Sequence, residues 1–274
     1  MRQSKEEWRR KERWPVRERN CKLKNYIFDL YGTLVDIHTD EEKPALWKAM
    51  AFLFSMMGAS YTPDVLRRRY GELVDEETEL ELAAAGKRLN GGELLPQETE
   101  IQLSHVFVRL LEERGVKADQ AQLGQIGMTF RSLSLEYIRL YEKVPKLLAG
   151  LRAEGKQIYL LSNAQRMFTE PEMRMLGIYD CFDGILYSSD AGVKKPSPYF
   201  FDALFQKYGL KKEESVMIGN EYRADILGAR AYGIRSLYVH TAQSGERPAS
   251  LPESCQEIAD IGQVAGSGGI EFEK

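Results

Sequence analysis

One aspartate occupies the position of a nucleophile. Residues 25–37 read Asn-Tyr-Ile-Phe-Asp-Leu-Tyr-Gly-Thr-Leu-Val-Asp-Ile, so a short apolar run ends at Asp29 and a Gly-Thr turn follows. Open α/β sheets carry their chemistry at the carboxyl ends of their strands. A carboxylate is ionised at pH 7, needs no base to activate it, and divides a difficult displacement into two easier steps. The sequence therefore predicts covalent catalysis at Asp29.

Three further motifs offer groups that an anion or a metal ion needs. Ser162-Asn163 ends a second apolar run, and a small hydroxyl group beside backbone N–H groups suits a transferring anion. Two lysines precede Pro196, and a cation is required wherever a carboxylate must approach an anionic substrate. The stretch Gly219–Asp225 contains the oxygen donors that Mg²⁺ prefers.

Five short apolar runs are expected to form the strands that position these residues: 24–29, 157–163, 184–188, 215–219 and 235–240. They lack polar alternation, which is typical of strands covered on both faces. Helical patterns lie between them at 144–154, 168–176, 198–208 and 224–232, each followed by a glycine that suits a helix end. This alternation predicts a parallel sheet with right-handed crossovers, and the tail adds a short expected helix at 254–264.

A helix-rich segment interrupts the alternation. Helical patterns are expected at 44–57, 62–82, 98–113 and 120–141, with glycines between them. A helical lobe inserted over the carboxyl edge of a sheet covers the site and selects the substrate. We therefore predict an α/β fold, a Rossmann-like parallel sheet core with an inserted helical cap domain. Its parts are a basic N-terminal extension (1–23), the core (24–40 and 144–274) and the cap (41–143).

Composition excludes several other classes of protein. The chain has 274 residues and a net charge of −3, so it has no general attraction to nucleic acid or anionic membranes. No apolar stretch approaches the roughly 18 residues that a membrane span needs, and the N-terminus lacks the apolar segment of a secretory signal. Cys21, Cys181 and Cys255 form neither a disulfide framework nor a zinc spacing, which favours a reducing cytoplasm.

The N-terminal extension is the one strongly basic segment. Residues 1–24 hold ten Lys or Arg and four Glu, with Trp8 and Trp14 interleaved among the arginines. A solvated extension is the simpler interpretation. An arm that binds nucleic acid or another partner is the weaker alternative.

The motifs and their order resemble the haloacid dehalogenase-like hydrolase superfamily with a helical cap in the first insertion position (C1-cap), over about residues 24–262. The resemblance implies a hydrolase in which Asp29 forms a covalent aspartyl intermediate. It implies that Ser162 binds a phosphoryl or other substrate oxygen, with Thr33 and Asn163 also binding substrate. Lys195 best matches the family's charge-neutralising Lys before Pro, with Lys194 in reserve.

Mg²⁺ is the cofactor that the resemblance implies. Asp29, the backbone carbonyl of Tyr31, and Glu221 or Asn220 would hold it, while Asp225 would orient these ligands. Many family phosphatases have Asp directly after the glycine, where this chain has Asn220 followed by Glu221. Asn220 still offers a carbonyl oxygen, and Glu221 offers a carboxylate with a longer reach.

Tyr31 separates the possible reactions. Family phosphatases usually carry a second Asp at this position, which protonates the leaving oxygen and then activates water. A Tyr with a pKa of about 10 cannot replace that base near neutrality. Haloacid dehalogenases carry Tyr here, because a departing halide needs no proton. However, residues 38–47 contain no Arg for a substrate carboxylate, and Glu221 favours a metal and hence a phosphate.

We therefore expect a Mg²⁺-dependent phosphatase of a small phosphorylated metabolite. A metal-independent 2-haloacid dehalogenase-type hydrolase is the alternative. A non-catalytic member that binds a ligand or partner is the second alternative. The expected partner is a small-molecule substrate, and the pattern leaves its identity and the oligomeric state open.

Overall fold

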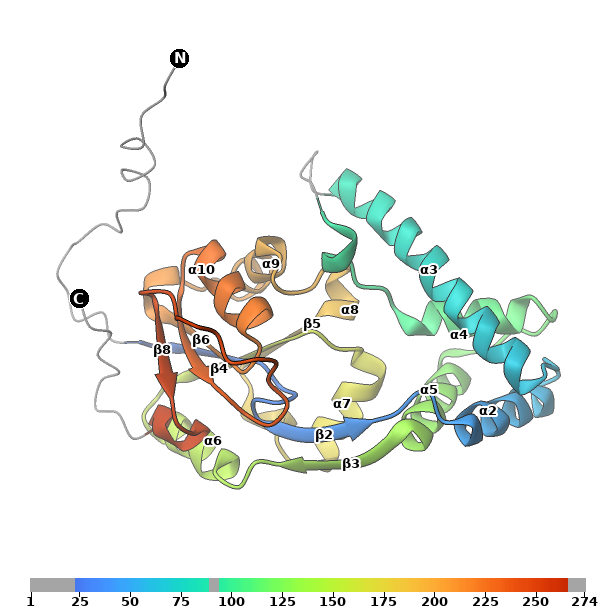
Figure 1. Cartoon of the computed structure of the whole chain (residues 1–274), viewed down its shortest axis with the longest axis horizontal. Helices are drawn as coiled ribbons and strands as arrows, with labels where there is room; N and C mark the ends of the chain where they lie inside the picture. Colours follow the sequence, from blue (N-terminus) through green and yellow to red (C-terminus); the bar gives the residue numbers. More distant parts are fainter. Residues whose placement is uncertain (1–22, 89–93, 266–274) are drawn as a thin grey trace, which may run out of the picture.

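A computed structural model describes residues 23–88 and 94–265, which form a sheet covered by helices and a helical insertion beside it (Figure 1). Residues 1–22 of the basic N-terminal extension, including Cys21, lie outside the described residues. Within the described ranges, none of the helices combines the length and the apolar character that a membrane span requires.

The strands are β1 (Asn25–Phe28), β2 (Val35–Thr39), β3 (Leu135–Leu140), β4 (Gln157–Ser162), β5 (Gly184–Tyr187), β6 (Ser215–Gly219), β7 (Arg235–Val239) and β8 (Cys255–Ile258). The α-helices are α2 (Pro44–Met56), α3 (Pro63–Arg88), α4 (Leu103–Glu112), α5 (Gln120–Ser134), α6 (Val144–Ala153), α7 (Arg166–Met175), α8 (Ser188–Ala191), α9 (Pro198–Tyr208) and α10 (Gly228–Tyr232). Shorter 3₁₀ turns are η1 (Pro96–Glu98), η2 (Tyr179–Cys181), η3 (Lys212–Glu214) and η5 (Ile261–Ala265), and η4 (Tyr222–Leu227) is a π-helical turn.

The main sheet has the strand order β5-β4-β1-β6-β7-β8, and all its pairs are parallel. The first strand is central, because Asn25 lies opposite both Gln157 of β4 and Ser215 of β6. This confirms the predicted parallel α/β sheet and all five expected strands. The carboxyl ends of β1, β4 and β6 therefore meet at one edge, where the sequence places Asp29, Ser162 and Asn220.

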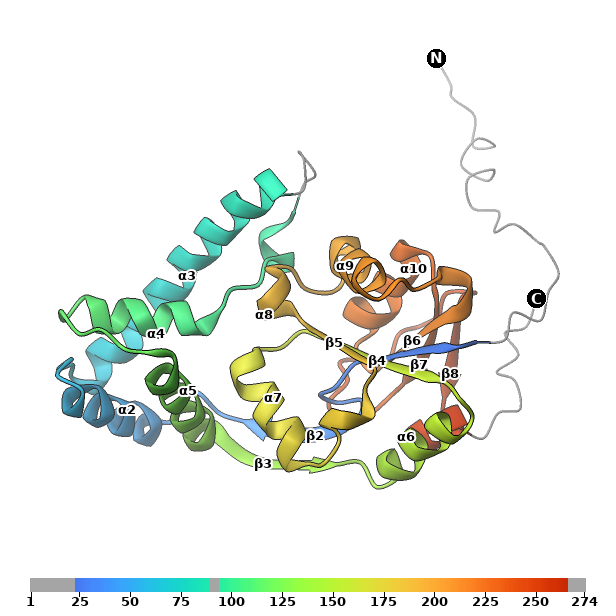
Figure 2. The same ribbon diagram turned by 180° about the vertical axis from the view of Figure 1, so that it is seen from behind.

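Alternating strand residues fill two cores, one on each face of the sheet. Phe28, Leu160 and Ile218 pack with α6 and α7, whereas Ile27, Leu161 and Met217 pack with α9 and α10. The same division of helices is visible from both sides of the molecule (Figures 1 and 2). Both faces are covered, as a parallel sheet requires.

A two-stranded antiparallel ribbon connects the sheet to the insertion. In it, β2 and β3 pair antiparallel, with Val35 opposite Leu140 and Ile37 opposite Ile138. The expected helix over 120–141 is therefore wrong beyond Ser134, because Leu135–Leu140 pairs with a strand about 100 residues earlier in the chain. The insertion itself consists of α2–α5, which pack around their own apolar cluster.

Other expected element bounds also needed correction. Residues 255–258 form β8 beside β7, and the turn η5 follows it, so the expected helix over 254–264 is wrong. The expected helix over 62–82 extends to Arg88, and the one over 98–113 begins only at Leu103.

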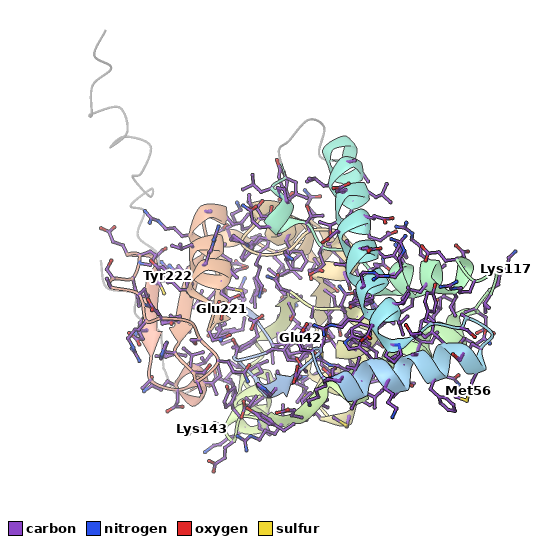
Figure 3. The ribbon with its side chains drawn as sticks, turned by 45° about the vertical axis from the view of Figure 1, so that its right-hand side comes forward. Glu42, Met56, Lys117, Lys143, Glu221 and Tyr222 are labelled. Carbon is purple, nitrogen blue, oxygen red and sulfur yellow. The ribbon has the colours of Figure 1, made fainter. Side chains whose placement is uncertain are left out.

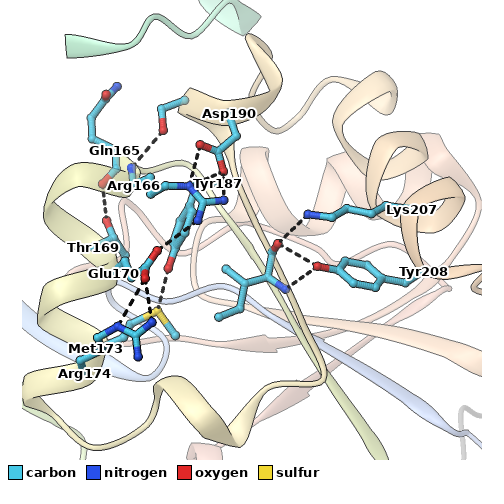
Figure 4. A network of polar contacts seen from close by, with 12 residues as sticks. Gln165, Arg166, Thr169, Glu170, Met173, Arg174, Tyr187, Asp190, Lys207 and Tyr208 are labelled. Carbon is cyan, nitrogen blue, oxygen red and sulfur yellow. Dashed lines mark hydrogen bonds and ion pairs between the residues drawn. The ribbon is translucent and has the colours of Figure 1, made fainter. Parts of the chain in front are cut away.

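A tyrosine covers the free edge of β5. The Ile185 N–H group donates to the Tyr208 hydroxyl, which lies 3.0 Å both from that nitrogen and from the Ile185 carbonyl oxygen. Figure 4 shows Tyr208 and its neighbour Lys207 reaching this backbone from α9. Gly184 leaves the room that the ring needs, because a Cβ there would lie 2.4 Å from Tyr208 Cζ.

Candidate active site

Asp29 lies at the carboxyl end of the central strand. Its backbone N–H donates to the Ile218 carbonyl at 2.9 Å, which extends the β1–β6 ladder and fixes the start of the following loop. The Asp29 side chain is 10% exposed. Its Oδ1 atom lies 2.7 Å from Lys195 Nζ, and its Oδ2 atom accepts from Thr33 Oγ1 at 3.1 Å. These contacts fix the orientation of the carboxylate at the edge of the sheet.

Lys195 is a buried cation shared by two carboxylates. Its ammonium lies 2.7 Å from Asp29 Oδ1 and 2.8 Å from Asp225 Oδ1. Burial alone would lower the pKa of Lys195, but Asp225 and Asp29 outweigh burial and raise it, so the side chain stays charged. Of the two candidate lysines, the structure places Lys195 beside Asp29.

Asn163 fixes the backbone of Lys195. The Lys195 N–H donates to Asn163 Oδ1 at 2.8 Å, and Asn163 Nδ2 donates to the Lys195 carbonyl at 3.0 Å. We call this two-way contact the Asn163–Lys195 clasp. It joins the loop after β4 to the loop before α9, and it uses both polar atoms of the amide that the sequence assigns to substrate binding.

Asp225 is the second carboxylate that contacts the Lys195 ammonium. It is fully buried on the π-helical turn η4, and its Oδ2 atom accepts from the Glu221 N–H at 2.9 Å while Oδ1 faces the ammonium. Burial raises the pKa of Asp225, and Lys195 opposes that rise. Gly219 is needed here because a Cβ would lie 2.2 Å from Asp225 Oδ2. π-Helical turns such as η4 are frequent at functional sites.

Ser162 presents a buried hydroxyl group at the end of β4. Its side chain is 1% exposed, and its Oγ atom has no hydrogen-bond partner among the described residues. A buried hydroxyl without a partner is unusual in folded proteins and calls for an explanation, such as a bound ligand. The sequence predicts this residue to be an anion-binding group.

Oxygen donors gather on the other side of Asp29. Thr33 Oγ1 lies 3.1 Å from Asp29 Oδ2 and 3.0 Å from Asn220 Oδ1, so both oxygens face one hydroxyl group. Glu221 is more exposed, yet burial of its carboxyl group and then the nearby Asp29 raise its pKa. Figure 3 labels Glu221 and Tyr222 on the core. Across residues 23–88 and 94–265, no three His, Cys, Asp or Glu side chains are grouped to hold a metal by themselves.

The Tyr31 side chain is held at the junction between the core and the insertion. Its hydroxyl group donates to the Glu172 carboxylate on α7 and lies 3.0 Å from Thr169 Oγ1. Burial, and then the charge of Glu172, raise the pKa of Tyr31 well above its usual range. The phenol therefore keeps its proton at neutral pH, in agreement with the expectation that it is not a general base.

The sequence did not indicate the residues that hold Tyr31. Arg131 on α5 pairs with Glu172 through Nε at 2.5 Å, and this ion pair is largely buried. Helix α5 approaches α7 closely at this point, where Phe130 stacks on Phe168 with ring centroids 6.1 Å apart. A lone Glu and a lone Arg in separate helices carry no local signal, so only their contact in the fold identifies them.

Three comparisons with known proteins bear on this site. A family model described as a haloacid dehalogenase-like hydrolase matches residues 23–233. Over 119 residues the chain is 29% identical to the glyceraldehyde 3-phosphate phosphatase of Methanothermobacter thermautotrophicus, covering 43% of this chain and 52% of that protein. The chain thus spans about half the length of that relative. Over 212 residues it is 29% identical to the phosphoglycolate phosphatase of Yersinia pseudotuberculosis, covering 77% and 78% of the two chains.

A solved structure of similar fold is the 2-haloacid dehalogenase of Pseudomonas syringae pv. Tomato DC3000. Its TM-score is 0.57 at 19% identity, and the superposition covers 89% of this chain and 97% of the dehalogenase. At this identity the likeness shows the fold alone. The same arrangement of sheet and insertion therefore occurs in a protein named as a dehalogenase, while the sequence relatives are named as phosphatases.

Proposed function

The chain belongs to the haloacid dehalogenase-like hydrolases, and we propose that it is a Mg²⁺-dependent phosphatase of a small phosphorylated metabolite, with Asp29 as its nucleophile. The observation that carries the proposal is the position of Asp29 at the end of the central strand, 2.7 Å from the Lys195 ammonium, with the hydroxyl of Ser162, unpartnered among the described residues, at the end of the neighbouring strand β4. The sequence relatives named as phosphatases support phosphate as the transferred group.

The proposed reaction has two displacements at phosphorus. In the first, an Asp29 oxygen forms a bond to phosphorus while the ester P–O bond breaks, and the leaving oxygen takes a proton from water to become an alcohol. In the second, water attacks the aspartyl-phosphate, which releases inorganic phosphate and restores the carboxylate. Lys195 and Ser162 would hold the phosphoryl oxygens as charge moves onto them.

The donors beside Asp29 fit Mg²⁺. Hard oxygen ligands of mixed type suit this ion, which keeps several waters. We propose that Asp29, Asn220 and the Tyr31 carbonyl hold it, with Glu221 reaching it directly or through water. Asp225 would instead position Lys195, because both its oxygens are engaged by the ammonium and the Glu221 N–H. When bound, the ion would offset the repulsion between Asp29 and the phosphate.

The Tyr31 side chain favours a second candidate, a dehalogenase-type hydrolase, because its raised pKa and its hydrogen bond to Glu172 make the phenol a poor proton donor to a leaving group. In that reaction the Asp29 ester forms at carbon as the halide leaves. A non-catalytic ligand-binding member stays the remaining alternative. We also propose a reducing compartment such as the cytoplasm, where the free Cys181 and Cys255 persist as thiols.

One set of assays separates these candidates. Purified protein is incubated with an aryl phosphate, with and without Mg²⁺, and separately with 2-chloropropionate, while phosphate and chloride are measured. We expect phosphate release that requires Mg²⁺, is lost in Asp29→Asn, and persists in Asp64→Asn, an exposed aspartate on α3. Chloride release that resists a chelator would overturn the proposal. Ligand binding without either product would point to the non-catalytic alternative.

A further inference from the structure

The insertion also contacts the core at a place away from the connecting β2–β3 ribbon. Residues 98–103, from the end of the turn η1 to the first residue of α4, lie against the core near α8, and we call them the strap. The Lys194 N–H donates to the Glu98 carbonyl at 2.8 Å, and the Glu100 N–H donates to the Gly192 carbonyl at 3.3 Å. Thr99 and Val193 form an antiparallel bridge between them. The strap thus pairs with the backbone that leads directly into Lys195.

The side chains of Glu100 and Gln165 connect the strap to the loop after β4, which carries Asn163. Glu100 accepts from Ser188 Oγ at 2.9 Å and from Gln165 Nε2 at 3.1 Å. Gln165 Nε2 also lies 2.8 Å from the Ile101 carbonyl, and its Oε1 atom accepts from the Leu103 N–H at 3.0 Å. Figure 4 shows Gln165 at the start of α7, just after the loop that carries Ser162 and Asn163.

These contacts close a ring around the Asn163–Lys195 clasp. On one side the strap holds Lys194, the residue before Lys195. On the other it holds Gln165, two residues after Asn163, and Ser188, whose Oγ atom accepts from the Ala164 N–H at 2.8 Å. Because both halves of the clasp are tied to the same segment, a displacement of the strap must displace the clasp.

We propose that the strap is a positioning device for Lys195. Through Glu100 and Gln165 it fixes the Asn163–Lys195 clasp, and the clasp fixes the ammonium beside Asp29. The proposal rests on the proposed function for the role of Lys195 and adds that the insertion sets the position of a core residue. Glu100 and Gln165 are positioning residues, because neither contacts Asp29.

Gln165→Ala tests the proposal, with Gln102→Ala as the matched control. Gln102 lies in the strap but is exposed, and its side chain takes no part in the ring. We expect Gln165→Ala to lower kcat for an aryl phosphate about tenfold with a smaller change in KM, because misplacing a transition-state contact costs more than weakening substrate binding. Hydrogen exchange at the Lys194 and Glu100 amides should accelerate in Gln165→Ala and stay unchanged in Gln102→Ala.

Glu100→Ala breaks the same ring from the side of the insertion and should reproduce both effects. If both variants match Gln102→Ala in kcat and exchange, the proposal is wrong. It is also wrong if exchange accelerates while kcat is unchanged, because the strap would then brace the fold without positioning Lys195. If the wild-type protein releases no phosphate, the proposed function fails. The affinity for inorganic phosphate, measured by calorimetry, then replaces kcat, with weaker binding in both variants supporting the proposal and equal binding overturning it.

Discussion

Tyr31 shows how a single residue can lose one role and keep another. Its hydroxyl group is committed to Glu172 and Thr169, and its raised pKa keeps it protonated. Its backbone carbonyl, two residues after Asp29, is one of the proposed metal ligands. The side chain therefore contributes to stability and the position of the loop, and proton transfer has to come from another group.

Tyr31→Phe separates these roles. We expect kcat to stay within a factor of about three, far from the 10²–10⁴ that a lost general acid or base costs. The free energy of unfolding should fall by about 1.5–3 kcal/mol, because Glu172 loses a hydrogen bond to its charged carboxylate. Steady-state kinetics and urea unfolding measure the two quantities.

The matched control is Tyr137→Phe, which removes a longer hydrogen bond, 3.3 Å from Asp36, at a side chain that is 44% exposed. It should leave both quantities nearly unchanged. A hundredfold loss of kcat in Tyr31→Phe at unchanged stability would show that the phenol takes part in the reaction.

At the scale of elements, Asp36 holds the two strands of the connecting β2–β3 ribbon together. Arg139 of the opposite strand donates to Asp36 Oδ2 through Nε at 2.9 Å and Nη2 at 2.7 Å, and Gln243 donates to Oδ1 at 2.7 Å. Burial would raise the pKa of Asp36, but these donors outweigh it and lower the pKa. The carboxylate thus ties β2 to β3 and both to the loop after β7.

The lowered pKa of Asp36 gives a pH prediction. A carboxyl group whose pKa is lower in the folded protein contributes stability above its unfolded pKa, about 3.9, and loses it as the pH falls. Asp36→Asn should therefore unfold at lower urea than the wild type at pH 7, and the difference should shrink at pH 3. An equal difference at both pH values would show that the charge of Asp36 contributes nothing.

The sequence identified elements best where their pattern is local. The strands β1, β4, β5, β6 and β7 are apolar runs, and each was expected correctly. By contrast, β3 follows α5 without a glycine or proline to end the helix, and β8 (Cys-Gln-Glu-Ile) is short and polar. Their strand conformation is set by pairing with β2 and β7, which a local pattern does not contain.

The same distinction applies to the site. Asp29 and Ser162 could be predicted together because strand ends meet at one edge of a parallel sheet, whereas Lys195 and Asp225 were indicated by the resemblance of their motifs to the family. The hydrogen bonds from Tyr31 to Glu172 and from Lys194 to the strap join segments that only the tertiary fold brings together. No spacing of residues in the sequence predicts these contacts. The Asn163 amide, selected as a substrate ligand, instead engages the Lys195 backbone.

At the scale of the whole molecule, the core and the insertion share an apolar cluster. Phe168 belongs to α7, which packs on the sheet, yet it is buried in the cluster of α2–α5 and stacks on Phe130. The two parts are also joined by the β2–β3 ribbon, the Arg131–Glu172 ion pair and the strap. We therefore expect them to unfold together.

Phe168→Ala tests this coupling. Removing a buried Phe side chain costs about 3–5 kcal/mol, and the urea midpoint should fall for core and insertion alike, in one transition. Limited proteolysis followed by mass spectrometry reports the two parts separately. Phe52→Ala, at a position that is 66% exposed on α2, should leave the midpoint unchanged. Early cleavage confined to α2–α5 would show that the insertion opens independently.

Tyr208 has a consequence for this protein at high concentration. Border strands of sheets recruit strands from neighbouring molecules, and proteins avoid aggregation by obstructing them. Here a phenol from α9 occupies the Ile185 amide and carbonyl that an incoming strand would use, and Gly184 makes room for it. The colloidal behaviour of the molecule in a crowded solution thus depends in part on one hydroxyl group remote from its chemistry.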